Sequence, residues 1–185
     1  MKKPIIGIVG RCGITMSGKD IMEVFEGYRK SVIISGGIPI TILPTQNEDY
    51  TFDREKTLKS LNEEEKEDLI AQIKLCNGII IPGGCRIFEY DKFICKYALD
   101  NNIPLLGICL GMQTMASVDC LNKKAIDIIN NGVDHRKEDK FVHNVEIKKE
   151  SLLYNIVGNN KFRVNSFHKC NVIDTNRFDI VRLFR

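Results

Sequence analysis

The chain has no tryptophan, only three histidines and only five prolines among its 185 residues. It also lacks any apolar run near the roughly 18 residues that a membrane-spanning helix needs. The amino-terminal segment MKKPIIGIVG carries two lysines, but its apolar run is too short for the core of a secretory signal peptide. We therefore expect a cytoplasmic protein that has no membrane partner.

No Cys-x-x-Cys pair occurs, although the chain contains seven cysteines. An odd number of cysteines without such a pair favours free thiols in a reducing compartment. The three histidines, His135, His143 and His168, lack the spacing of a metal site as well. We expect no metal and no other cofactor, and the polar segments around His135 and His143 predict that both side chains are exposed.

A strong net charge is missing too, since the formal charge at pH 7 is only +3. No basic stripe alternates with aromatic residues, which argues against a nucleic-acid partner and leaves a small molecule as the expected ligand. The 43% hydrophobic and 28% charged content is typical of a globular protein. The length predicts a single domain over residues 1–185 and leaves assembly into a homo-oligomer open.

What the chain does have is an alternation of short apolar runs with amphipathic segments. Three apolar runs begin with Pro4, Pro39 and Pro104, and a fourth begins at Gly78. Proline is tolerated at the start of a strand, and continuous apolar runs fit strands buried on both faces. Apolar residues at helical spacing predict helices at 20–35, 62–76, 88–101 and 110–118. The alternation predicts an α/β fold with a doubly wound, mainly parallel sheet and helices on both faces.

The remaining segments are less regular. Residues 44–61 are polar and predict a long loop, and the charged residues 136–140 predict a solvated surface. After residue 120 the alternation weakens, and partial two-residue patterns predict strands at 142–147, 163–167 and 179–184.

The segment PLLGICLGMQ, residues 104–113, has the most informative pattern in the chain. Gly107, Cys109 and Gly111 form a Gly-x-nucleophile-x-Gly sequence between an expected strand and an expected helix, which is typical of a nucleophile elbow. The tight turn needs glycine on either side, and the helix amino terminus favours a thiolate. The pattern predicts that Cys109 is a nucleophile, and the alternative is a buried cysteine that happens to have glycine neighbours.

A second pattern follows the expected strand that begins at Gly78. Ligands of open α/β sheets bind beyond the carboxyl ends of the strands, where Pro82, Gly83 and Gly84 lie. Backbone N–H groups of such a loop, together with that of Leu110, can form an oxyanion hole for the nucleophile's substrate. An ordinary turn is the alternative.

Residues 13–19, GITMSGK, resemble a phosphate-binding P-loop, which also follows a strand and opens a helix. The next residue is Asp20, where Mg²⁺ coordination requires serine or threonine, and its carboxylate would repel the phosphate. We therefore do not expect nucleotide binding and interpret this segment as a loop near the site.

A cysteine nucleophile also needs a base, because only a few per cent of an unperturbed thiol is ionised at neutral pH. His168 lies at the end of an expected strand, where it can reach the same edge of the sheet. Asn165 and Ser166 beside it are suited to hydrogen bonding a ligand.

PLLGICLGMQ, with PGG upstream and VNSFH downstream, resembles the class I glutamine amidotransferases. It looks most similar to their γ-glutamyl hydrolase branch, peptidase family C26, which includes γ-glutamyl-γ-aminobutyrate hydrolase. The opening KPIIGIVGR and residues 36–44 are also similar, so the resemblance runs from Pro4 to about His168. It implies a flavodoxin-like sheet and hydrolysis of a γ-glutamyl amide through a thioester on Cys109.

The resemblance also assigns roles around the nucleophile. Gly84 and Leu110 would supply the oxyanion N–H groups, and the glutamyl pocket would be lined by Gly83, Gln113 and the segment Asn165, Ser166 and His168. The leaving amine is not specified, and a separate synthase that accepts ammonia stays open as a partner.

The chain departs from the family pattern in one respect that bears on catalysis. The family's general base lies in a His-Pro-Glu motif that is absent here, and no histidine follows His168. Three interpretations stay open: a domain that is incomplete at its carboxyl end, a pseudoenzyme that binds γ-glutamyl ligands without turnover, or His168 acting as the base. A stress or chaperone protein with a similar cysteine elbow is a further, less favoured alternative.

Overall fold

The computed structural model describes residues 2–50, 59–120, 124–129, 135, 141–178 and 182–184. Residue contacts divide the chain into two compact units, residues 1–118 and 119–185, and each unit is described by itself. The expectation of a single domain stays a prediction. Among the described residues, no helix is both long enough and apolar enough to cross a membrane.

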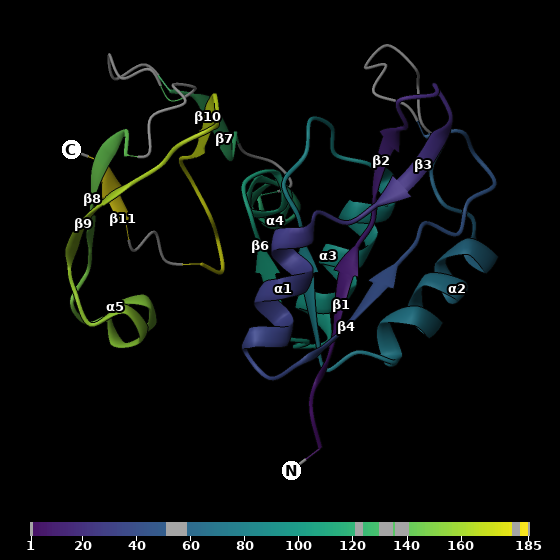
Figure 1. Cartoon of the computed structure of the whole chain (residues 1–185), viewed down its shortest axis with the longest axis horizontal. Helices are drawn as coiled ribbons and strands as arrows, with labels where there is room; N and C mark the ends of the chain where they lie inside the picture. Colours follow the sequence, from purple (N-terminus) through teal and green to yellow (C-terminus); the bar gives the residue numbers. More distant parts are fainter. Residues whose placement is uncertain are drawn as a thin grey trace. The chain divides into compact units, whose positions relative to one another are not determined.

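The first unit is built on a four-stranded parallel sheet in the order β4-β1-β5-β6 (Figure 1). Its strands are β4 (Ile38–Ile42), β1 (Ile5–Val9), β5 (Gly78–Ile81) and β6 (Leu105–Gly107). These are the four apolar runs that the sequence predicts as strands. The expected burial is confirmed for β5, but it is wrong for the edge strands, where Ile38 of β4 and Leu106 of β6 are exposed. The expected flavodoxin-like α/β class is confirmed.

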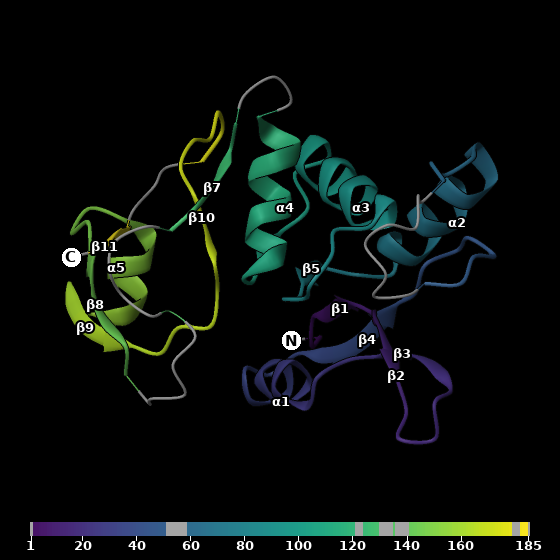
Figure 2. The ribbon, with the colours of Figure 1, turned by 90° about the horizontal axis from the view of Figure 1, so that it is seen from above.

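Helices cover both faces of this sheet (Figure 2). One face carries α1 (Glu26–Ile34), and the other carries α2 (Glu63–Lys74), α3 (Glu89–Asp100) and α4 (Leu110–Asp119). Alternate residues of one strand enter the two cores, because successive side chains of a strand point to opposite faces. In β1, Ile8 packs with Val32 of α1, whereas Val9 packs in the larger core with Leu69 of α2 and Ile94 of α3.

The start of α2 shows how local sequence sets an element's boundary. The Asn62 side chain accepts a hydrogen bond from the Glu65 N–H at 2.9 Å, and the Glu65 carboxylate accepts one from the Asn62 N–H at 2.8 Å. This capping box satisfies two of the donors that a helix leaves unpaired at its amino end. The helix predicted at 62–76 is confirmed as α2.

The helix predicted at 20–35 is wrong in its first part. Residues Asp20–Glu23 form strand β3, which pairs antiparallel with β2 (Arg11–Ile14), and α1 begins only at Glu26. A turn between the two strands allows this pairing, with Gly18 at φ +78° donating its N–H to the Thr15 carbonyl at 2.9 Å. A P-loop needs a helix at this point, so the hairpin also removes the structural basis for nucleotide binding.

The described residues of the second unit form two small antiparallel sheets. One has the order β11-β8-β9 and the other pairs β10 with β7. The elements are β7 (Ile126–Ile128), β8 (His143–Ile147), α5 (Leu152–Val157), β9 (Lys161–Val164), β10 (Cys170–Val172) and β11 (Arg182–Phe184).

The strand predictions for the second unit have mixed outcomes. The strand at 142–147 is confirmed as β8. The strand expected at 163–167 ends at Val164, so Asn165, Ser166 and His168 lie in an extended connection. Only 182–184 of the strand expected at 179–184 are described, and residues 51–58 of the expected loop and the 136–140 surface lie outside the described residues.

Two glycines offer a matched test of the packing around α4. A Cβ on Gly111 would lie 2.0 Å from the Ile81 carbonyl oxygen, whereas a Cβ on Gly27 of α1 would meet nothing within 4 Å. Gly111→Ala should therefore lower the free energy of unfolding by about 1–3 kcal/mol. Gly27→Ala should raise it by about 0.5–1 kcal/mol. Urea denaturation measures both, and equal effects of the two substitutions would contradict this packing.

Candidate active site

Cys109 lies in the tight connection between β6 and α4 and is exposed. Its φ is +53°, the left-handed region that an L-residue enters at a cost of roughly 1–2 kcal/mol. Backbone hydrogen bonds hold this turn: the Ile108 N–H donates to the Ile81 carbonyl at 3.0 Å, and the Gln113 N–H donates to the Cys109 carbonyl at 3.1 Å. Such strain in an exposed cysteine is the geometry expected of a nucleophile elbow.

The glycines on either side of Cys109 are required by close backbone approach. A Cβ on Gly107 would lie 2.6 Å from the carbonyl carbon of Gly111, and a Cβ on Gly111 would meet Ile81 at the end of β5. The turn can therefore form only with glycine at both positions. The spacing that predicts an elbow from the sequence has this steric origin.

The Pro-Gly-Gly loop after β5 lies beside the elbow. A Cβ on Gly83 would be 3.4 Å from the Cys109 Cβ, and a Cβ on Gly84 would be 3.2 Å from Leu110 Cδ2. Among the described residues, no acceptor receives a hydrogen bond from the Gly84 or Leu110 amide. The structure thus brings Gly83, Gly84, Cys109 and Leu110 together, and their roles stay predictions.

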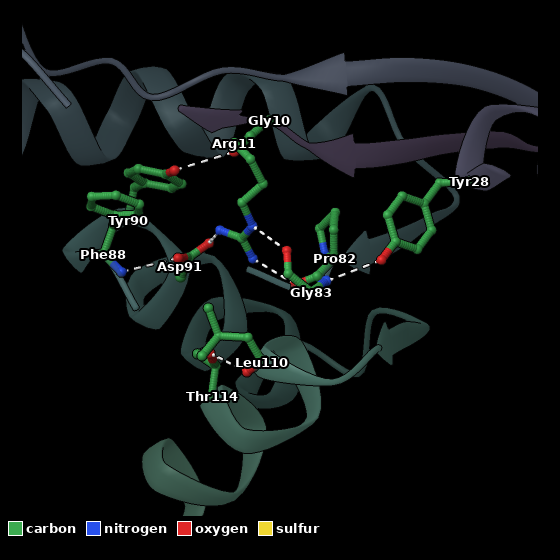
Figure 3. A network of polar contacts seen from close by, with 10 residues as sticks. All are labelled: Gly10, Arg11, Tyr28, Pro82, Gly83, Phe88, Tyr90, Asp91, Leu110 and Thr114. Atoms are coloured by element: carbon green, nitrogen blue, oxygen red, sulfur yellow. Dashed lines mark hydrogen bonds and ion pairs between the residues drawn. The ribbon is translucent and has the colours of Figure 1, made fainter. Parts of the chain in front are cut away.

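Arg11, at the start of β2, forms hydrogen bonds with the backbone of this loop (Figure 3). Its guanidinium donates to the Pro82 carbonyl at 2.8 Å and to the Gly83 carbonyl at 3.2 Å. Because a trans peptide places C=O and N–H on opposite sides, the held Gly83 carbonyl turns the Gly84 N–H away from Arg11. The Gly83 N–H donates to the Tyr28 hydroxyl at 3.2 Å, which leaves Gly84 as the donor of this loop.

A buried carboxylate keeps Arg11 in place. Asp91 of α3 is fully buried; it accepts from Arg11 Nη1 at 2.6 Å and from the Phe88 N–H at 3.0 Å. Burial lowers the pKa of the Arg11 guanidinium, but the charge and hydrogen bond of Asp91 keep that pKa above its ordinary value. Burial raises the pKa of the Asp91 carboxyl, and the contacts with Arg11 and Phe88 offset this only in part. Burial disfavours the charged forms of both Arg11 and Asp91, and each is stabilised in its charged form by the other.

Arg11, Tyr28 and Asp91 are site-supporting residues that the sequence does not reveal. Arg11 directly follows an apolar strand, which is a weak signal for a buried cation. Its partner Asp91 is 80 positions away, and no local pattern connects the two.

Gln113 of α4 belongs to the first unit and is buried. Gly83 belongs to the first unit too, whereas the remaining predicted pocket residues belong to the second unit, where Ser166 is buried, Asn165 is exposed and His168 is half-buried. The substrate roles of Gln113, Asn165, Ser166 and His168, and the role of His168 as base, stay predictions.

The expected exposure of His135 and His143 is wrong. Their side chains are 5% and 8% exposed, and both rings contact or approach the ring of His168. His143 points inward because β8 alternates buried and exposed residues. The backbone of His135 is joined to that of His168, because the His135 carbonyl accepts a hydrogen bond from the His168 N–H at 3.3 Å. A cluster of three histidines follows from this burial.

All seven cysteines are free thiols. Cys85 and Cys109 are exposed, whereas Cys12, Cys95 and Cys120 are buried. Burial raises the pKa of the Cys12 thiol and of the Cys76 thiol, which disfavours their reactive thiolate forms. Cys85 therefore provides an exposed reference thiol in the same unit as Cys109.

Comparison with known families and sequences finds two kinds of similarity. The Peptidase C26 family matches residues 89–180, about half of the chain. A CTP synthase of Bacillus subtilis is 47% identical over 74 residues, which make up 38% of this chain and 14% of that protein. A CTP synthase of Lactobacillus johnsonii is 45% identical over 78 residues, or 40% of this chain and 14% of that protein. The chain matches only a small part of these relatives' length.

Two solved structures share the fold. A glutamine amidotransferase from Thermotoga maritima has a TM-score of 0.58 at 15% identity. The match covers 98% of this chain and 67% of the amidotransferase chain. The glutaminase domain of Trypanosoma brucei CTPS, with bound acivicin, has a TM-score of 0.57 at 16% identity. The match covers 92% of this chain and 68% of that domain's chain.

Replacing Arg11 tests the support of the Pro-Gly-Gly loop. Arg11→Met leaves the Asp91 carboxylate buried without its cation, which should lower the free energy of unfolding by about 3–5 kcal/mol. Arg29→Met is the matched control, because it removes an arginine that pairs with Glu26 on the exposed face of α1. Chemical denaturation should show little change for that control. A similar loss in both variants would contradict the importance assigned to the buried pair.

Proposed function

Because the chain belongs to the class I glutamine amidotransferase-like superfamily, we propose that it hydrolyses a γ-glutamyl amide through a thioester on Cys109. The substrate class is glutamine or a γ-glutamyl amine. The observation that carries the proposal is Cys109 itself, exposed at φ +53° in a strand-to-helix turn beside the Pro-Gly-Gly loop.

The first chemical step is attack of the Cys109 thiolate on the γ-carbonyl carbon of the substrate. A carbon–sulfur bond forms and the carbonyl oxygen takes up negative charge. We assign the N–H groups of Gly84 and Leu110 to donate to this oxygen; the closeness of Gly84 to Leu110 supports this assignment, and the amino end of α4 would add a favourable dipole. Loss of one such donor typically lowers kcat by about 10²–10³-fold.

In the second step the carbon–nitrogen bond breaks, and the leaving nitrogen takes a proton as ammonia or amine departs. Water then adds to the thioester, the carbon–sulfur bond breaks, and glutamate and the free thiol form. His168 is the proposed carrier of these protons.

The glutamyl group of the substrate would be held by Gly83, Gln113, Asn165, Ser166 and His168. The Peptidase C26 match covers residues 89–180, which include every member of this set except Gly83. Similarity to CTP synthases supports glutamine as one substrate, and a synthase that receives the ammonia is a proposed partner.

Covalent labelling tests the nucleophile directly. Acivicin, an electrophilic amino acid that is bound in the related Trypanosoma brucei domain, should add once per chain to the wild type. Peptide mapping by mass spectrometry should place the adduct on Cys109, and an excess of L-glutamine should slow the labelling. Cys109→Ala should stay unlabelled, whereas Cys85→Ala, which removes the other exposed thiol of this unit, should label normally.

Labelling of Cys85 at the rate of Cys109, or none at Cys109, would overturn the proposal. An assay of ammonia release from L-glutamine separates catalysis from binding. A protein that is labelled at Cys109 but releases no ammonia or amine would instead be a ligand-binding pseudoenzyme.

A further inference from the structure

We propose that His135, His143 and His168 form a binding site for one divalent transition-metal ion, with zinc as the expected ion. His143 follows His135 by eight positions and His168 lies 25 positions further on, and all three belong to the second unit. The site does not include Cys109, so its failure would leave the proposed thioester chemistry untouched, whereas its success would assign His168 to the metal and not to proton transfer.

The geometry of the three rings suits a shared ligand. One ring nitrogen from each histidine lies within 4.8 Å of the others. The ring centroids are 4.8 Å apart for His135 and His143, and 4.9 Å apart for His135 and His168. Tetrahedral zinc with Zn–N bonds of about 2.0–2.1 Å places its ligand nitrogens roughly 3.4 Å apart. Binding would require the three nitrogens, which lie within 4.8 Å of one another, to close to that spacing.

Hydrogen bonds at the Nδ1 atoms set the tautomers that metal binding requires. Nδ1 of His143 lies 3.1 Å from the Asn144 carbonyl, and Nδ1 of His168 lies 2.9 Å from the Cys170 carbonyl. A carbonyl only accepts, so both Nδ1 atoms carry the proton and Nε2 of each neutral ring carries the lone pair. Metal-binding histidines typically donate their other N–H to a carbonyl or carboxylate in this way.

The ring of His135 also has a hydrogen-bond partner at Nδ1. Nδ1 of His135 lies 2.8 Å from Oγ of Ser166, and both side chains are buried. The hydroxyl can accept from Nδ1, which again leaves the Nε2 lone pair of His135 for a metal. Ser166 is therefore a positioning residue in this proposal.

Electrostatics and ligand chemistry favour a metal ion of the zinc type. Three imidazole nitrogens close together at a largely buried point offer lone pairs to a dication. Imidazole nitrogen suits Zn²⁺, Cu²⁺ and Ni²⁺, and hard ions such as Mg²⁺ prefer oxygen. Three histidines leave a fourth tetrahedral position for water or another ligand. A metal on Nε2 of His168 would also exclude this ring as the base for Cys109.

Metal titration of the chelator-treated full chain tests the site. Calorimetry with Zn²⁺ should show one ion per chain, and Co²⁺ should give the visible absorption of a tetrahedral complex without a thiolate charge-transfer band. X-ray absorption of the zinc form should show nitrogen ligands at about 2.0–2.1 Å and no sulfur at about 2.3 Å.

Variants separate the cluster from the free thiols. Ser166→Ala should weaken zinc binding by roughly 10–100-fold, and His143→Gln should weaken it more. Cys170→Ala is the matched control: it keeps the carbonyl that accepts from His168 and should bind zinc normally.

Wild type without stoichiometric zinc, or zinc bound through sulfur, would overturn the proposal. Unchanged affinity in a folded His143→Gln would do the same. If circular dichroism shows that His143→Gln does not fold, the ligands seen in the wild-type spectra decide the question.

Discussion

The site depends on the close approach of the amino end of α4 to the carboxyl end of β5. Gly111 packs so tightly on the Ile81 carbonyl that no side chain fits there, and the same approach requires glycine at Gly107. The chain between these contacts must turn sharply, which places Cys109 at φ +53°. The strain at the nucleophile is thus a consequence of sheet–helix packing, and the buried core of the first unit supplies the energy that maintains it.

A second interaction converts this turn into a candidate catalytic site. The Arg11–Asp91 pair fixes the carbonyls of the loop beside the elbow, so the direction of the Gly84 N–H is set before a substrate binds. Preorganised donors of this kind are effective because they need no reorientation as charge develops. Arg11 binds the loop carbonyls and Asp91 binds Arg11, so the contribution of the pair is to position the loop backbone.

Sequence reasoning succeeded where the physical cause is local. The four parallel strands, the helix α2 and the elbow glycines each show a short pattern whose cause lies within a few residues. It failed where distant segments decide the outcome. Residues 20–23 have helix-like apolar spacing, but pairing with β2 makes them a strand. His135 and His143 stand among polar neighbours, and their burial arises only from the fold of the second unit.

The central claim is that Cys109 carries the substrate's γ-glutamyl group. Wild-type protein can be mixed with L-glutamine, quenched in acid within one turnover, and examined by intact-mass and peptide mass spectrometry. We predict the added mass of one γ-glutamyl group on Cys109 and none on the Cys109→Ala variant. Glutamate formation that persists in Cys109→Ala, or an acyl group on a different residue, would contradict the account.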